Sequence, residues 1–120
     1  MRVIIAGSRN ITEQAVVDAA IAASGFEITQ VLSGNARGVD RLGETWAVAH
    51  TVDLKLFPAA WDLHGRSAGF RRNAAMVKFA AETGGALVAV WDGKSPGTKS
   101  TIDLAHKAGL QVYIYTYFIL

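Results

Sequence analysis

Four short polar segments combine glycine with arginine, serine or asparagine, which are residue types that bind anions. They cover residues 7–10, 33–40, 69–73 and 92–98. Glycine lets backbone amides come close to a ligand, and the planar guanidinium group of arginine presents several donors to phosphate oxygens. Asp40 cannot bind an anion directly, so it suits a sugar hydroxyl, an arginine or its own loop. The pattern indicates a ligand that is both anionic and hydroxylated.

Each polar segment follows a short apolar run that is typical of a buried parallel strand. The runs cover residues 3–6, 29–32, 54–57, 87–91 and 110–115, and helical spacing between them predicts four helices. This alternation predicts an α/β fold class, a Rossmann-like three-layer sandwich with a five-stranded, mainly parallel sheet and helices on both faces. Ligands of such sheets bind beyond the carboxyl ends of the strands, so we expect the polar segments to share one edge.

The helical segments have recognisable ends and faces. Thr12 and Thr98 are predicted N-caps, and Gly25 and Gly109 are predicted to end helices in the left-handed conformation. The apolar face of the first helix is expected to contain Ala15, Val16, Ala19 and Ala23.

Residues 58–69 form the longest stretch in which apolar residues follow neither helical nor strand spacing, which makes these residues a candidate lid. Trp61, Phe70 and Trp91 lie near the polar segments and offer faces on which a base could stack, although core packing is the favoured interpretation for Trp91. Asp62 and His64 allow acid–base chemistry, and a solvated loop position is the simpler interpretation of both.

Composition limits the remaining possibilities. The 120 residues make one domain, and a net charge of +2 is too small for a nonspecific duplex-binding surface, so nucleic acid is not an expected partner. The chain starts without a leader-like apolar core and contains no cysteine, so we expect a cytoplasmic protein with no membrane partner. The apolar residues 113–120 either complete the core or dock on a neighbouring subunit, which is compatible with the homo-oligomer, a dimer or higher, that we expect.

No cofactor or metal is expected from the motifs. The three histidines and the carboxylates do not fall at metal-ligand spacing. A phosphate-binding Walker motif and a complete G-x-G-x-x-G fingerprint are both absent from the sequence.

Residues 2–9, 32–47, 61–76 and 91–105 resemble, in order and spacing, the YspA-like, cpYpsA-related branch of the SLOG superfamily of Rossmann-like nucleotide-binding domains. The resemblance covers nearly the whole chain and implies a pocket for a nucleotide or an ADP-ribose-like molecule. The pocket residues that it implies are Gly7, Ser8, Arg9, Ser33, Gly34, Arg37, Gly38, Asp40, Arg72, Asn73, Asp92, Gly93, Ser95, Gly97 and Thr98.

The resemblance also bears on catalysis. In the related LOG phosphoribohydrolases, an Arg and the Glu of a P-G-G-x-G-T-x-x-E motif cleave the N-glycosidic bond of a nucleoside monophosphate. Thr101 stands at the position of that Glu and has no carboxylate, so no catalytic residue is assigned.

Three functions follow from the sequence and this resemblance. The favoured one is binding, to sense or sequester a phosphorylated or ADP-ribose-like signalling nucleotide in bacterial or phage defence or counter-defence. An N-glycosidase or other nucleotide hydrolase is the alternative, with Asp40, Asp62 or Asp92 in place of the missing Glu. A DprA-like binder of single-stranded DNA is a third, which the low net charge disfavours.

Overall fold

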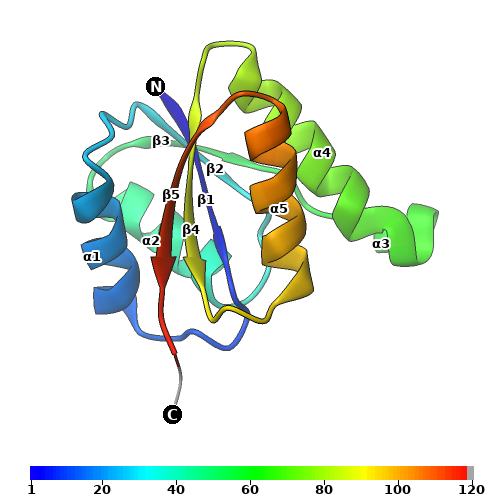
Figure 1. Ribbon diagram of the computed structural model, residues 1–120, viewed down its shortest axis with the longest axis horizontal. Coiled ribbons are helices and arrows are strands. Elements are labelled where there is room, and N and C mark those ends of the chain that lie inside the picture. Colours follow the sequence, from blue (N-terminus) through cyan, green and yellow to red (C-terminus); the bar gives the residue numbers. More distant parts are fainter. Residues whose placement is uncertain (119–120) are drawn as a thin grey trace.

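The computed structural model describes residues 1–118, in which a parallel β-sheet lies between two layers of helices (Figure 1). Its strands are β1 (Arg2–Gly7), β2 (Gln30–Ser33), β3 (Asp53–Leu56), β4 (Ala86–Trp91) and β5 (Gln111–Thr116). Its helices are α1 (Gln14–Ser24), α2 (Val39–Ala49), α3 (Trp61–His64), α4 (Ala68–Ala81) and α5 (Pro96–Lys107), with a short 3-10 helix, η1 (Gly65–Ser67), before α4. The strand order is β3-β2-β1-β4-β5 and every pairing is parallel, which confirms the predicted Rossmann-like α/β class.

Alternating side chains of the central strands build a hydrophobic core on each face of the sheet. Val3 and Ile5 of β1 pack with residues of α1 and α2, whereas Ile4 and Ala6 pack with residues of α4 and α5. All four side chains are buried. Because both faces are covered, the buried middle parts of the central strands are apolar on both sides, and this explains why the sequence showed continuous apolar runs.

The predicted strands lie within one residue of the observed ones, but the predicted apolar face of α1 is wrong. The buried residues of α1 are Val17, Ala20 and Ile21, whereas Ala15 and Ala19 are exposed. Val17 and Ile21 are one helical turn apart and bury more apolar surface than the alanines, so their side of the helix turns to the sheet.

Both predicted N-caps are also wrong. Glu13 precedes α1 and Ser95 precedes α5, whereas Thr98 lies inside the first turn of α5. Proline is favoured at the first position of a helix, and Pro96 starts α5 two residues before the threonine. The two glycines predicted to end helices are confirmed, with φ of 70° and 79° at Gly25 and Gly109.

Residues 58–69 are not the irregular loop that the sequence predicted. The amides of Leu63 and His64 both donate to the carbonyl of Ala60, and these bonds close the single turn of α3. Ala68 is buried and begins α4, so residues 69–73 are helical instead of being the end of a loop. The α3 segment projects from the body of the molecule beside α4 (Figure 1).

The described part of the apolar C-terminal segment completes the core with its tyrosines, whereas Ile114 and Phe118 are exposed. Tyr113, Tyr115 and Tyr117 pack against the cluster that holds α1, and the Tyr117 hydroxyl donates to Glu13 Oε1 at 3.0 Å. Residues 119–120 of this segment, for which core packing or docking on a neighbouring subunit was predicted, lie outside the described residues.

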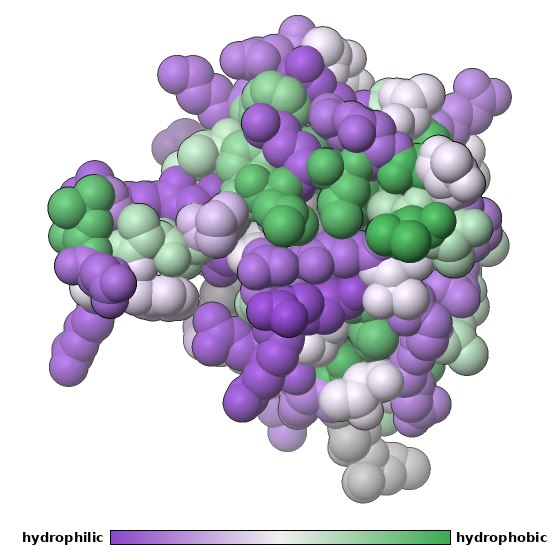
Figure 2. Space-filling model, turned by 180° about the vertical axis from the view of Figure 1, so that it is seen from behind, coloured by the Kyte–Doolittle hydropathy of each residue, from purple (hydrophilic) through white to green (hydrophobic). Residues whose placement is uncertain are grey.

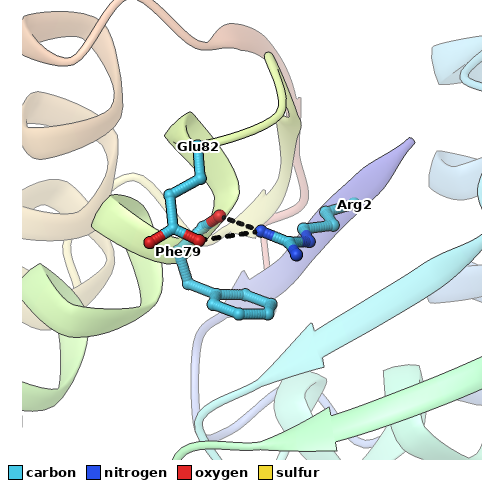
Figure 3. Close-up of polar contacts among 3 residues, drawn as sticks. All are labelled: Arg2, Phe79 and Glu82. Carbon is cyan, nitrogen blue, oxygen red and sulfur yellow. Dashed lines mark hydrogen bonds and ion pairs between the residues drawn. The ribbon is translucent and has the colours of Figure 1, made fainter.

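Arg2 anchors the amino end of β1 to α4 (Figure 3). Its Nη1 atom donates to the Phe79 carbonyl at 2.8 Å and lies 3.2 Å from Glu82 Oε1, and its guanidinium carbon lies 3.7 Å from the centroid of the Phe79 ring. We expect Arg2→Ala to lower the free energy of unfolding by about 1–2 kcal/mol, measured by urea denaturation, because a hydrogen bond and a cation–π contact are both lost.

An exposed ion pair provides the control for this prediction. Lys99 Nζ lies 2.9 Å from Asp103 Oδ2 on the surface of α5, where solvent screens the pair. Lys99→Ala is expected to change the free energy of unfolding by less than about 0.5 kcal/mol. Equal losses in the two variants would show that the contacts of Arg2 add nothing beyond a surface ion pair.

Candidate functional site

Two adjoining pockets lie at the carboxyl edge of the sheet. The inner pocket has a volume of about 60 Å³, which is room for a few water molecules or one small polar group. The outer pocket has a volume of about 350 Å³, within the range of small-molecule sites. Arg9, Ala36 and Arg72 line both pockets, so two guanidinium groups stand where the pockets meet.

The structure places most of the predicted site residues around these pockets. Arg9 and Arg72 were both among them, and they line both. The other predicted residues that line the inner pocket are Gly7, Asp40, Asn73, Ser95, Gly97 and Thr98, and those that line only the outer pocket are Gly34 and Arg37. The segments that follow β1, β2 and β4 therefore meet with the first turns of α4.

The amino end of α5 forms one wall of the inner pocket. Among the described residues, no side chain caps this helix, and Pro96 at its first position has no amide hydrogen. A Cβ atom added to Gly97 would meet no heavy atom within 4 Å, so the backbone here is open to the pocket. Unpaired amides and the positive end of the helix dipole make this wall suitable for an anion.

Asp40 places a buried carboxyl group in the same pocket. It lies in the first turn of α2 with only 6% of its surface exposed, and its Oδ2 atom accepts a hydrogen bond from the Ala36 amide at 3.1 Å. Burial raises the pKa of this carboxyl from 3.8 to about 6, although the Ala36 bond and the positive charge of Arg72 both oppose the shift. A carboxyl with such a pKa is able to exchange a proton near neutral pH.

The raised pKa of Asp40 predicts a specific pH dependence of stability. The folded state holds this proton more tightly than the unfolded chain, so Asp40 contributes stability below about pH 4 that is lost as the pH rises to about 6. We expect Asp40→Asn to gain about 3 kcal/mol relative to wild type between pH 4 and pH 7, measured by urea denaturation across that range.

Asp92 provides a control of opposite sign. Its Oδ1 atom accepts the amides of Ser95 and Lys94, and these bonds lower the pKa of the carboxyl. Its stabilisation is therefore present at neutral pH and lost as the pH falls below about 4, so Asp92→Asn should lose stability relative to wild type as the pH rises to about 4 and show little further change up to pH 7. The same pH profile in both variants would contradict the burial of Asp40.

Arg72 is held in place by the chain on two sides. Its Nε atom donates to Asn73 Oδ1 at 2.7 Å and its Nη1 atom donates to the carbonyl of Gly34. A Cβ atom on Gly34 would lie 2.6 Å from Arg72 Nη1 and 2.7 Å from Asp40 Oδ2. The absence of a side chain at Gly34 therefore lets the arginine and the aspartate come close to each other.

The remaining predicted residues line neither pocket and instead support the loops. The fully buried Ser8 accepts the Asp92 amide on its Oγ atom at 3.0 Å, and the fully buried Ser33 donates to Glu44 Oε2 at 2.7 Å. Gly38 has φ of 79°, and its position against the Ser8 carbonyl leaves no space for a Cβ. Gly93, with φ of 81°, turns the chain between β4 and α5.

The prediction that the glycines let the backbone approach a ligand is wrong at most positions. We expected them to let the backbone approach a ligand, yet a Cβ on Gly7 would lie 2.0 Å from the Val90 carbonyl, and Gly34 and Gly38 also face atoms of the protein. Of the glycines lining the inner pocket, Gly97 is the one that faces open space. At most of these positions glycine is required by the close packing of the protein itself.

Trp61 supplies an aromatic wall to the outer pocket. It is 51% exposed on α3, and a Cβ on Gly69 would lie 3.4 Å from its ring, so the indole lies across the start of α4. Phe70 and Trp91, the other predicted stacking residues, line neither of the two pockets. Trp91 packs against the core on the side of α4 and α5, as expected, and its Nε1 atom donates to the Ser95 carbonyl at 3.1 Å.

Glu44 supports the site but was not predicted from the sequence. One Glu44 oxygen accepts the Ser33 hydroxyl, and Asn35 Nδ2 lies 3.0 Å and 3.1 Å from the two carboxylate oxygens. This network holds the loop between β2 and α2, including Asn35 at φ of 59°. A signal was available, because Glu44 lies one helical turn after Asp40 and so on the same side of α2.

The described residues contain neither a metal-ligand cluster nor a membrane-spanning helix. Within residues 1–118 no three His, Cys, Asp or Glu side chains come close enough to share a metal ion. In the same residues no helix is long and apolar enough to cross a membrane.

A parallel sheet with polar pockets beyond its carboxyl edge defines the class of Rossmann-like α/β proteins. Within that class, the chain belongs to the YspA, cpYpsA-related SLOG family, whose model matches residues 1–64. This finding confirms the family resemblance, and at a coarse level the family points to nucleotide-related binding or processing.

A phage protein is similar to this chain over nearly its whole length. The gene 61 protein of Mycobacterium phage D29 is 34% identical over 120 aligned residues, which cover 92% of this chain and 93% of that protein. No solved structure matches the chain significantly.

Proposed function

We propose that this protein binds a phosphorylated nucleotide at the two adjoining pockets and so senses or sequesters it. The observation that carries the proposal is the position of Arg9 and Arg72, which line both pockets at their junction. A phosphate at this junction is within reach of two guanidinium groups and of the open amino end of α5. Each charge-assisted hydrogen bond contributes about 1.5–3 kcal/mol, so a few suffice for micromolar binding after the cost of association.

The outer pocket suits the rest of the nucleotide. Its volume of about 350 Å³ is in the range of small-molecule sites, and Trp61 offers an indole face for a base. Arg37 on the same pocket adds a third positive charge, which favours a ligand with two anionic groups, as in ADP-ribose. The setting that we propose is bacterial or phage defence signalling, and one relative of the chain is encoded by Mycobacterium phage D29.

The proposal is tested by calorimetry with AMP, ADP, ADP-ribose, cyclic ADP-ribose, a cyclic dinucleotide and adenosine. We expect at least one phosphorylated compound to bind with a Kd in the micromolar range, and adenosine to bind more weakly by tenfold or more. If no compound binds with a Kd below about 1 mM, the proposal is wrong, because such a site would gain less than about 4 kcal/mol from its ligand.

Trp61 gives a more specific prediction. Stacking on an aromatic side chain is worth about 1–3 kcal/mol per base, so Trp61→Ala should weaken binding by about tenfold or more. Leu63, on the same short helix and 76% exposed, lines neither of the two pockets, and Leu63→Ala is the matched control. Equal affinities of the two variants in the same titration would exclude base stacking on Trp61.

A second candidate is supported by Asp40. Of the three aspartates that could replace the missing Glu, Asp40 lines the inner pocket, whereas Asp62 and Asp92 line neither pocket. Thr101, at the position of that Glu, lines the same inner pocket, and its hydroxyl donates to the Gly97 carbonyl. A carboxyl with a pKa of about 6 is suited to proton transfer in cleavage of an N-glycosidic bond.

This hydrolase alternative has its own assay. Nucleoside monophosphates are incubated with the protein at high concentration, and free base is measured by chromatography. Release of base that disappears in Asp40→Asn would support catalysis by Asp40. Binding without any release of base in the wild-type protein would leave the binding function alone.

A further inference from the structure

The edge of the sheet at β3 carries exposed apolar residues. β3 is an outer strand in the sheet order, and Figure 1 views the sheet from the opposite edge, with β5 in front. Figure 2 therefore shows the β3 edge, and apolar side chains gather across the middle of this face. Leu56 on β3 is 46% exposed, and Val48 at the end of α2 is 73% exposed. Such residues on an edge strand mark a surface for association.

The backbone of β3 is also available for pairing. The Phe57 amide donates to the Ser33 carbonyl of β2 at 2.8 Å. Because amide directions alternate along a strand, the amides and carbonyls of Leu54 and Leu56 point away from β2. Among the described residues, no strand lies on that side of β3. A further strand would therefore find unused donors and acceptors there.

We propose that β3 pairs antiparallel with β3 of a second copy of this chain, with the two-fold axis passing through Leu54. In this register Asp53 lies opposite Lys55 of the second copy, and Lys55 lies opposite its Asp53. Both residues are exposed, and their alternate positions put them on the same face of the sheet. Within one copy, Asp53 Oδ2 accepts a bond from Gln30 Nε2 of β2 at 2.7 Å, so Asp53 Oδ1 is the oxygen that would meet the lysine of the second copy. Opposite charges in directly facing positions stabilise an antiparallel pair, so two such pairs form in one interface.

The same register brings the apolar residues together. It places Leu56 opposite Val52 of the second copy, and Val52 is joined to the end of α2 by the bond from its amide to the Ala47 carbonyl. Val48, in the last turn of α2, precedes Val52 by four residues, and we expect Leu56 of the second copy to cover it. Each copy thus offers the same self-complementary patch, as a two-fold interface requires.

Shifting the register so that the axis passes through Lys55 would place two lysines opposite each other, which is unfavourable. The β5 edge, with exposed Ile114 and Phe118, is the competing surface. It is the surface indicated by the apolar C-terminal segment. Charge substitutions at β3 and at β5 distinguish the two possible interfaces.

The test is sedimentation equilibrium on the full chain and its variants. Wild type is expected to form a dimer at about 100 µM. Lys55→Asp and Asp53→Lys each turn two attractions into two repulsions and should weaken the dimer by about tenfold or more. The double variant, Asp53→Lys with Lys55→Asp, exchanges the charges and should restore the wild-type dissociation constant. Lys78→Asp, at an exposed position of α4, is the control and should leave the dimer unchanged.

Three results would overturn the proposal. They are a monomeric wild type at that concentration, single charge variants that dimerise like wild type, and a double variant that stays as weak as the singles. Loss of the dimer in Ile114→Asp, with Lys55→Asp unaffected, would assign the interface to β5 instead. Circular dichroism verifies that each variant is folded. Asp53 and Lys55 line neither nucleotide pocket, so this test is independent of ligand binding.

Discussion

Arg72→Ala is expected to weaken binding of a phosphorylated nucleotide by about tenfold to a hundredfold, measured by calorimetry. Arg72 lines both pockets, and its removal takes away one guanidinium group from the phosphate, which costs about 1.5–3 kcal/mol for each lost bond. It also takes away the bond to the Gly34 carbonyl, so the loop after β2 loses a support. Affinity for adenosine should fall much less, because that ligand has no phosphate.

Substitutions of Arg71 and Arg9 distinguish a loss of ligand affinity from a loss of stability. Arg71 is exposed, donates to Ser67 Oγ at 3.0 Å and lines neither of the two pockets, so Arg71→Ala should bind like wild type. Arg9 is exposed and lines both pockets, so Arg9→Ala should weaken binding with little change in thermal stability. If Arg71→Ala weakens binding as much as Arg72→Ala, general electrostatic attraction explains the affinity and a specific phosphate site does not.

Gly7→Ala is expected to be the most damaging single substitution for stability. A Cβ atom at this position would lie 2.0 Å from the Val90 carbonyl oxygen and 2.7 Å from Val39 Cγ2. The Val90 carbonyl also accepts the Ser8 amide at 3.1 Å, so β1, β4 and α2 would all have to move. We expect a loss of about 3 kcal/mol or more in the free energy of unfolding, measured by urea denaturation.

Gly97→Ala is the matched control, since its added Cβ meets no atom within 4 Å. Its stability should stay within about 0.5 kcal/mol of wild type. Because Gly97 lines the inner pocket, larger residues there, as in Gly97→Val, should weaken nucleotide binding in a folded protein. Comparable losses of stability in Gly7→Ala and Gly97→Ala would mean that the packing around β1 tolerates a side chain.

The sequence by itself was sufficient to predict the fold and the edge of the sheet at which the polar segments meet. Continuous apolar runs and helical spacing are local patterns, and each strand was located within one residue. Predictions of helix starts and helix faces were less reliable where two patterns within one helix competed. Thr98 was a plausible N-cap, but α5 begins earlier, at Pro96. The alanines of α1 formed a predicted apolar face, but the side of the helix with Val17 and Ile21 is the buried one.

The tertiary structure decided what each polar residue does. In the sequence Ser8 and Ser33 look like ligand-binding residues, but both are fully buried. Ser8 accepts the amide of the distant Asp92, and Ser33 donates to Glu44 of the next helix. The burial that raises the pKa of Asp40, and the division of the site into two pockets that meet at Arg9 and Arg72, depend on segments far apart in the sequence. Periodicity reports which side of an element is buried, whereas exposure, hydrogen-bond partners and cavity shape depend on packing between elements, which no local pattern contains.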